Sequence, residues 1–341
     1  LCPNDFEWSE GGATDRLVSF VDFAATVLSL VGLEAPRHMQ GKAFLGSHAV
    51  EPREFVHTFR GRRGERYDMV RGVRSQRFLY LRNFSPQVPV MQFNGYSWNM
   101  IPSYRAWWEA WKAGDLPSEQ ARWFEAPKPP EELYDVIADP DCVHNLATEL
   151  AYGDAVDQHA EALSRHVLEI RDSGLFPEGL SGRDWPAYQD NERYPLDELL
   201  PLALLVSSQN TESLDEFQEA LASVNPCLRY WGVMGCVVLG DRAAPAEAAL
   251  RERLEDDEPL IQIQAARALA GMGMVEPAVP VLRDALGKKD DVLKLRALLA
   301  IDECDLLSVA EDELRPLVEK TRKGGGYGSR VAEHLVSRQK R

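Results

Sequence analysis

The chain has 341 residues, of which 45% are hydrophobic and 27% are charged, a composition typical of a folded protein with room for two domains. Its 38 Lys and Arg residues against 54 Asp and Glu residues give a net charge of −16, which argues against nucleic-acid binding as the main function. The longest apolar run, residues 20–33, is interrupted by polar residues and falls short of the ~20 residues that a membrane span needs. We therefore expect neither a nucleic-acid partner nor a membrane span.

Neither the cysteines nor the first residues indicate the cellular compartment of the protein. The five cysteines are far apart and lack the paired spacing of a zinc site or a disulfide framework: Cys2, Cys142, Cys227, Cys236 and Cys304. The sequence opens on Leu1 rather than Met, without the basic and apolar regions of a leader peptide. We expect it to be a piece of a longer protein whose amino-terminal part, with any targeting signal, lies outside it.

The first half is predicted to mix helices and strands. Asp22 stands immediately before the first helical stretch and is the expected N-cap of that helix. Proline punctuates an irregular segment, residues 84–130. The elements expected in chain order are a helix over 23–31, strands over 54–59, 67–74 and 77–83 (the last two a hairpin), a helix over 104–112, a strand over 132–136 and a helix over 151–171. His159 and His166, seven residues apart on the last helix, indicate a solvated face rather than a metal site.

The second half repeats itself. The matching positions are Pro226, Gly232, Cys236 and Gly240, then Pro259, Ala265, Leu269 and Gly273 at an interval of 33, then Ala297 and Ile301 at an interval of 32. Small residues suit positions where helices approach closely, and aliphatic residues four positions later share the same face. Helix pairs at this period predict a solenoid that resembles short HEAT repeats, with a further pair beginning at Pro195. An irregular helical bundle is the alternative.

A basic cluster stands out in this acidic chain. Its members lie within 18 positions: His57, Arg60, Arg62, Arg63, Arg66, Arg71 and Arg74. Local positive charge in a negative protein focuses anions, and the guanidinium fork fits sulfate, phosphate or carboxylate. The alternative is a set of surface arginines paired with Glu51, Glu54 and Glu65.

An aromatic cluster follows it. Its members are Trp98, Trp107, Trp108, Trp111 and Trp123, with Tyr96 and Tyr104. Exposed rings beside positive charge suit the apolar faces of sugars, but packing is the favoured interpretation, since Trp107 and Trp111 share one helical face. The sequence has no Gly-rich phosphate loop, no His-x-x-x-His pair, no Gly-x-Ser-x-Gly elbow and no Cys-x-x-Cys pair.

Several motifs over about residues 9–180 resemble, in order and spacing, the later half of the sulfatase family, and arylsulfatases related to heparan N-sulfatase in particular. They are residues 14–22 (TDRLVSFVD), 33–36 (LEAP), 39–46 (MQGKAFLG), 67–74 (YDMVRGVR), 80–83 (YLRN), 128–135 (KPPEELYD), 139–141 (DPD) and 145–147 (NLA). Some bacterial members carry a helical-repeat extension after this region. The resemblance implies an α/β fold class: the C-terminal part of an alkaline-phosphatase-like sulfatase fold with a small antiparallel β subdomain, followed by an all-α HEAT-like solenoid.

The resemblance also implies domain limits and chemistry. Residues 1–180 would be the end of the sulfatase domain, 181–194 a linker and 195–341 the helical repeats. The implied reaction is hydrolysis of a sulfate ester or sulfamate, on a sulfated carbohydrate or aryl sulfate, using formylglycine made from a Cys/Ser-x-Pro-x-Arg motif and a calcium ion held by Asp and Asn. Neither that motif nor the family's metal-binding segments occur in this sequence. We therefore assign no catalytic or metal-binding residue and expect this piece alone to be inactive.

The resemblance also implies which residues of this sequence contact the substrate. The family often has Arg-Asp-Arg after the strand that corresponds to residues 54–59, and here the triplet is Arg60-Gly61-Arg62. Arg60 and Arg62, with His57, are the predicted substrate-binding residues. The resemblance favours a periplasmic or secreted protein, and the repeats offer a surface for a protein partner. The alternatives are a phosphodiesterase or phosphonate hydrolase of the same superfamily, or a non-catalytic HEAT-repeat scaffold.

Overall fold

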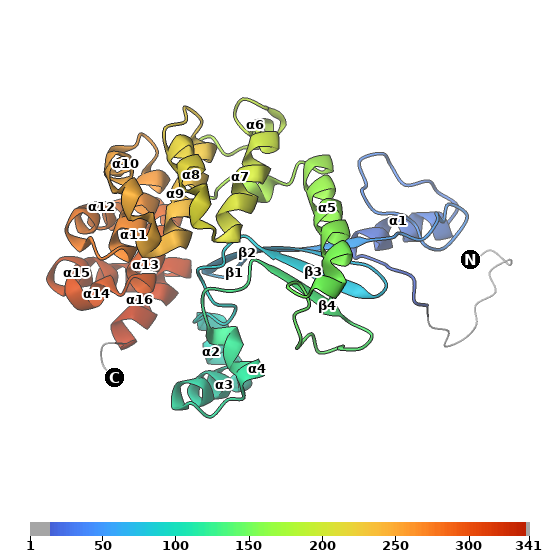
Figure 1. The fold of residues 1–341 in the computed structure, drawn as a ribbon, viewed down its shortest axis with the longest axis horizontal. Coiled ribbons are helices and arrows are strands. Elements are labelled where there is room, and N and C mark those ends of the chain that lie inside the picture. Colours follow the sequence, from blue (N-terminus) through green and yellow to red (C-terminus); the bar gives the residue numbers. More distant parts are fainter. Residues whose placement is uncertain (1–13, 339–341) are drawn as a thin grey trace. The chain divides into compact units, whose positions relative to one another are not determined.

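The computed structural model describes residues 14–338, and these form two compact units (Figure 1). Unit 1 contains, of the described residues, 14–59, 71–82 and 131–165. Unit 2 contains 60–70, 83–130 and 166–338. The linker expected over 181–194 stays a prediction.

One four-stranded sheet has the order β1-β2-β3-β4. Its strands are β1 (Val56–Arg63), β2 (Arg66–Arg74), β3 (Phe78–Asn83) and β4 (Glu131–Asp135). Turns of two and three residues join the first three strands, as antiparallel hairpins require, and β3 pairs antiparallel with β4 so that Tyr80 lies opposite Leu133. The predicted antiparallel β subdomain is therefore confirmed.

The first helix, α1 (Val21–Leu30), begins two residues earlier than predicted, and the prediction that Asp22 is its N-cap is wrong. Asp22 lies inside the first turn. Its buried carboxylate accepts hydrogen bonds from the backbone N of Ser19 (2.8 Å) and of Lys42 (2.7 Å) and pairs with Arg53. The Asp22 side chain thus connects the start of α1 to Lys42 and Arg53, far along the chain. A local sequence pattern does not show such distant partners.

The long helix α5 (Gly153–Glu169) carries a buried histidine, contrary to the solvated face that we expected. His159 is 1% exposed. Its Nδ1 lies 2.7 Å from the carbonyl O of Ala155, and its Nε2 lies 3.0 Å from Ser75 Oγ. The ring also meets Phe55 edge-on at 5.2 Å. Both ring nitrogens are therefore satisfied inside unit 1 without a metal.

Unit 2 contains successive helices that stack side by side (Figure 1). They are α7 (Leu196–Ser208), α8 (Leu214–Leu221), α9 (Pro226–Leu239), α10 (Glu247–Glu252), α11 (Pro259–Gly271), α12 (Val275–Gly287), α13 (Asp291–Glu303), α14 (Leu306–Val309), α15 (Glu311–Arg322) and α16 (Gly326–Arg338). The two prolines that are 33 positions apart open α9 and α11. A Cβ on Gly232 would lie 2.8 Å from the backbone O of Phe217 and 2.9 Å from the N of Leu221. Glycine therefore allows α9 to approach α8, as the repeat predicted, and the helical solenoid is confirmed.

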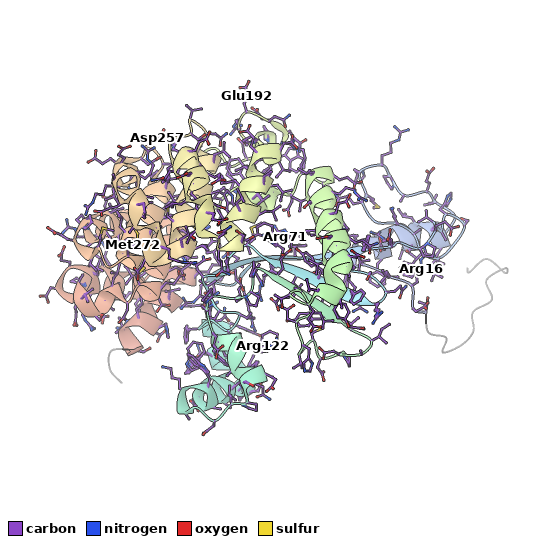
Figure 2. All side chains as sticks on the ribbon, in the orientation of Figure 1. Arg16, Arg71, Arg122, Glu192, Asp257 and Met272 are labelled. Carbon is purple, nitrogen blue, oxygen red and sulfur yellow. The ribbon has the colours of Figure 1, made fainter. Side chains whose placement is uncertain are left out.

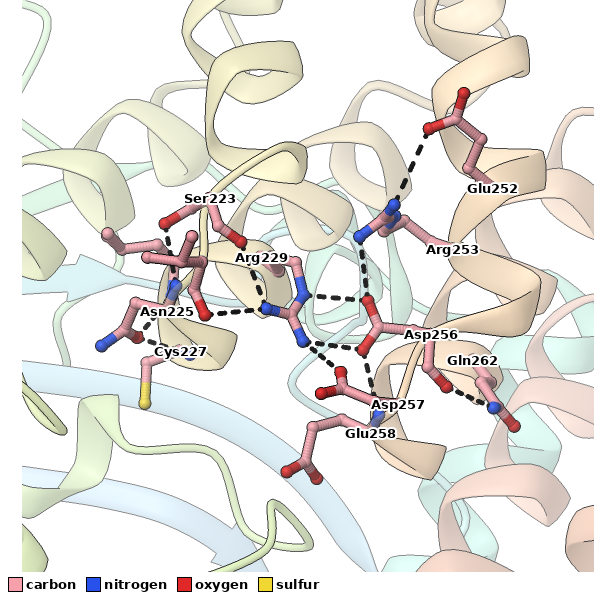
Figure 3. A network of polar contacts seen from close by, with 12 residues as sticks. Ser223, Asn225, Cys227, Arg229, Glu252, Arg253, Asp256, Asp257, Glu258 and Gln262 are labelled. Carbon is pink, nitrogen blue, oxygen red and sulfur yellow. Dashed lines mark hydrogen bonds and ion pairs between the residues drawn. The ribbon is translucent and has the colours of Figure 1, made fainter.

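A buried ion pair ties consecutive repeats together (Figure 3). Arg229 on α9 donates from Nε and Nη2 to the two carboxylate oxygens of Asp256, each at 2.9 Å. Its Nη1 donates to the carbonyls of Ser223 (3.1 Å) and Val224 (3.0 Å). The side chains of Arg229 and Asp256 are 8% and 1% exposed. Because a buried charge is tolerated only when it is paired and hydrogen-bonded, this contact fixes the loop before α11 against α9.

Unit 2 also holds the aromatic segment, on α2 (Gly95–Met100), α3 (Pro102–Ala113) and α4 (Ser118–Ala121); a short helix, α6 (Trp185–Gln189), comes later in the chain. Met91, Tyr104 and Phe124 are buried together, and Trp107, Trp108 and Trp111 pack against them. Figure 2 shows the side chains of this part around Arg122. Within residues 14–338, no helix has both the length and the apolar character needed to cross a membrane.

Candidate functional site

Strand β1 carries all the predicted substrate-binding residues. His57 belongs to unit 1, whereas Arg60 and Arg62 belong to unit 2. Arg60 and Arg62 are two positions apart, which places them on the same face of a regular strand. The grouping of His57 with the two arginines stays a prediction.

Arg60 is held by a buried carboxylate. It pairs with Asp68 of β2, which also pairs with Lys128. The side chains of Asp68 and Lys128 are each 3% exposed, whereas that of Arg60 is 34% exposed. Two cations thus share one buried carboxylate.

Arg62 lies between aromatic rings. Its guanidinium is 4.8 Å from the ring centre of Tyr327 and 5.8 Å from that of Tyr67, and its Nε is 3.3 Å from a carboxylate oxygen of Glu178. Arg296 stacks on Tyr67 at 3.3 Å. Burial raises the pKa of Tyr67 against the opposing charge of Arg296, so the hydroxyl stays protonated. An anionic ligand would have to compete with Glu178 for Arg62.

The neighbouring arginines have their own partners. Arg63 donates to Ser97 Oγ at 2.9 Å, and Arg66 donates from Nη1 to Asp302 at 2.6 Å and from Nε to the carbonyl of Phe93 at 2.6 Å. Arg66 is thus a buried residue paired with a carboxylate other than the expected Glu51, Glu54 and Glu65. The acidic partners differ from the expected ones because the fold supplies them from residues far along the chain.

Glu65, one of the expected partners, supports the next helix instead. Its buried carboxylate accepts from the backbone N of Gly95 at the start of α2 and lies 3.7 Å from Arg330. The side chain of Asn94 caps the same helix by accepting from Ser97 N at 2.9 Å. The β1–β2 turn and α2 are thus fixed to each other.

A small cavity lies among the arginines. Its lining includes Arg60, Arg63, Arg66, Asp68, Gln92, Asn94 and Tyr104. Its volume is about 10 Å³, which is room for about one water molecule. A sulfate group does not fit into it, so any anion would meet Arg60 from outside this cavity.

A much larger cleft adjoins it and shares Arg66 and Gln92 with it. This aromatic cleft has a volume of about 880 Å³, within the usual range for small-molecule sites. Its wall includes Met91, Phe93, Trp98, Trp108, Trp111, Lys112, Phe124, Asp302, Arg330, Glu333 and His334. The sequence drew attention to the tryptophans; the residues from α13 and α16 lie some 200 positions further along the chain, and no sequence signal connects them to the tryptophans.

The implied metal has no evident site among the described residues. Residues 14–338 contain no group of three or more His, Cys, Asp or Glu side chains placed to hold an ion. They therefore do not fit the calcium that the family resemblance implies, and the chain lacks the Cys/Ser-x-Pro-x-Arg motif that would supply formylglycine.

Comparisons with known proteins agree with the two parts of the chain. A family model for HEAT repeats matches residues 206–302. A protein named ulvan-active sulfatase, from Formosa agariphila (strain DSM 15362 / KCTC 12365 / LMG 23005 / KMM 3901 / M-2Alg 35-1), is 36% identical over 163 residues, which is 48% of this chain and 27% of the relative. The chain thus spans about a quarter of the length of this curated relative.

Two solved structures are similar over part of the chain. One is a 2-O GAG sulfatase, with 16% identity, a TM-score of 0.33 and coverage of 49% of this chain and 28% of that one. The other was solved in complex with its substrate D-glucosamine-2-N,6-O-disulfate, with 17% identity, a TM-score of 0.28 and coverage of 44% and 24%. At these TM-scores neither match adds to the argument. The chain is thus similar to a sulfatase over 48% of its length and matches HEAT repeats over residues 206–302.

Proposed function

We propose that this chain is the carboxyl-terminal part of a sulfatase that hydrolyses sulfate esters or sulfamates of a sulfated carbohydrate. The match to a relative named for its activity on ulvan supports the substrate class. That match, at 36% identity over 163 residues, carries the proposal, and the outer face of α1 supports the presence of a second domain.

That face is apolar and exposed in unit 1. Phe20, Phe23, Val27 and Val31 are spaced as one helical stripe and are 89%, 46%, 60% and 64% exposed. The opposite face, with Asp22, Ala25, Thr26 and Ser29, is buried. Burying one such apolar side chain is worth about 1.5–3 kcal/mol, so a contiguous stripe of this kind indicates a surface that another domain covers. The occupant we propose is the catalytic α/β domain of the sulfatase, which would supply the formylglycine and the calcium.

In this proposal the chain contributes binding rather than bond cleavage. Arg60, Arg62 and His57 of β1 are the proposed contacts to the anionic sugar, and Arg60 is the first to test because its side chain is 34% exposed. Guanidinium groups hold sulfate through two parallel hydrogen bonds. We further propose that the protein acts in the periplasm or outside the cell, where a polymeric glycan is accessible.

The test is sulfate release from ulvan by the protein that the whole gene encodes, with a Cys/Ser-x-Pro-x-Arg segment expected in its coding sequence. Arg60→Ala should raise KM about tenfold with little change in kcat, because it removes binding common to the ground and transition states. Arg165→Ala is the matched control, since Arg165 lies 68% exposed in a helical pair with Glu161. Cleavage of a phosphodiester or phosphonate but not of a sulfate would favour the related hydrolases, and the absence of any hydrolysis would contradict the proposal.

The docking of α1 has its own test. Val27→Glu places a charge on the exposed stripe, so it should leave unit 1 folded but prevent the catalytic domain from covering it. The whole protein should then lose activity and expose a protease-sensitive domain junction. Full activity in this variant would refute the proposed contact.

A further inference from the structure

The aromatic cleft has the features of a carbohydrate-binding site. The proposed hydrolysis of sulfate does not itself require such a site. Its tryptophans come from two helices: Trp98 from α2, and Trp108 and Trp111 from α3. Trp98 meets Trp108 edge-on at 6.1 Å, and Phe124 stacks on one face of Trp111 at 4.9 Å. Indole rings placed on the wall of a cleft offer apolar surfaces to the C–H faces of pyranose rings.

Polar residues from α13 and α16 line the same cleft. His334 of α16 stacks on Phe93 at 3.8 Å, and its Nε2 lies 3.8 Å from Asp302 of α13. Arg330 on α16 is 47% exposed, and its carboxylate partner Glu65 is 3.7 Å away. These contacts place cationic and hydrogen-bonding groups in the same cleft as the indoles.

Ion pairs offset most of the charges on the wall. Asp302 pairs with Arg66, Glu303 pairs with Arg267, and Arg330 lies 3.7 Å from Glu65. Lys112 and Glu333 are exposed on the same wall. This near-balance suits a ligand with spaced single charges rather than a densely charged one.

Arg66 adds a donor that lacks a partner. The residue is 4% exposed and lines the cleft, and its Nη2 has no hydrogen-bond partner among residues 14–338. A buried donor without a partner costs about 1–3 kcal/mol. An acceptor oxygen that reached Nη2 from the cleft would satisfy it, as would a water in the small cavity that Arg66 also lines.

We propose that the aromatic cleft binds a sulfated oligosaccharide, with pyranose rings against Trp98 and its neighbours and sulfate groups near Lys112, Arg330 and Arg66. The choice of a sulfated rather than a neutral sugar rests on the proposed function, whereas the site itself does not. Its role would be to hold the polymer while its substituents are processed.

The experiment is calorimetric titration of the 341-residue chain with ulvan oligosaccharides and with the same oligosaccharides after chemical desulfation. Trp98→Ala is the main variant because Trp98 lies at the end of a short helix, outside the buried set of Met91, Tyr104 and Phe124. Trp185→Ala is the control, since Trp185 is 74% exposed and does not line the cleft. We expect saturable binding that is weaker for the desulfated ligand, a Kd raised about tenfold by Trp98→Ala, and a smaller rise with a reduced salt dependence for Lys112→Gln.

Two results would overturn the proposal: no saturable binding of either oligosaccharide, or equal affinity of Trp98→Ala and Trp185→Ala with unchanged far-ultraviolet circular dichroism. Equal binding of the desulfated ligand would reject the sulfate contacts, and binding of a helical peptide alone would assign the cleft to a protein partner. Because the titration requires no turnover, glycan binding without sulfate release from the whole gene product would reject the proposed function and leave this inference standing.

Discussion

Removing the carboxylate of Asp256 should destabilise the helical repeats strongly. Asp256 accepts both of its 2.9 Å hydrogen bonds from Arg229, and a further one from the backbone N of Glu258 at 3.0 Å. Loss of one partner of a buried ion pair typically costs about 3–5 kcal/mol. Arg229 would keep its hydrogen bonds to Asp257 and to two backbone carbonyls. We therefore expect Asp256→Ala to lower the free energy of unfolding by about 3 kcal/mol, the lower end of this range.

The assay is urea unfolding of the chain followed by far-ultraviolet circular dichroism at pH 7. Glu247→Ala is the control, because Glu247 and its partner Arg251 are 43% and 47% exposed, and such exposed helical pairs contribute about 0.3–0.5 kcal/mol. The double variant Arg229→Met, Asp256→Leu should recover much of the loss, since apolar residues replace both charges. A loss below about 1 kcal/mol for Asp256→Ala would refute the reasoning.

The pH dependence of stability provides a second test of the ion pair between Arg229 and Asp256. Burial alone would raise the pKa of Asp256, but hydrogen bonds from Arg229 and from the backbone of Glu258, together with the charge on Arg229, outweigh it and lower the pKa. A lowered pKa gives stability that is complete above the unfolded value of about 3.9 and is lost as the pH falls through the folded value. The difference in the free energy of unfolding between wild type and Asp256→Ala should therefore be constant above about pH 5 and decrease below about pH 4.

Three further predictions concern single residues. Gly232→Ala should cost about 1–3 kcal/mol, since its Cβ would lie 2.8 Å from a backbone oxygen of α8, whereas Gly271→Ala, with no atom within 4 Å, should be neutral or stabilising in the same urea assay. Burial lowers the pKa of His159, against the raising effects of the Ala155 carbonyl and Glu54; the unfolded chain therefore takes up a proton before the folded one, and stability should fall as the pH drops below about 6.5. His159→Gln should flatten that slope, and an unchanged slope would contradict the assignment. Burial raises the pKa of Cys227 and of Cys236 to about 12, so both thiols should react with Ellman's reagent only on unfolding, and rapid labelling of either in the folded chain would show that its burial is wrong.

Local signals account for the parts of the fold that the sequence predicted. The turn between β2 and β3, the prolines that open α9 and α11 and the small residue at Gly232 all act through neighbours within one hairpin or one helix pair. The sulfatase-related motifs likewise extend over a continuous stretch, so their order and spacing along the chain are enough to indicate the family. Helix and strand ends shifted by only a few residues, because propensity and capping compete over about one turn.

Residue patterns along the chain predicted the type of most elements, the repeat and the concentration of arginine and tryptophan, but not the short helices α2, α4 and α6. What those arginine and tryptophan side chains contact follows from the folded structure. Asp22 binds Lys42, Arg62 binds Glu178 and Arg66 binds Asp302, over intervals of 20 to 236 positions. The polar residues of the aromatic cleft include Asp302 of α13 and His334 of α16. Charge pairing, burial and cavity shape depend on distances in space, and a linear pattern of residue types encodes such distances only through the completed fold.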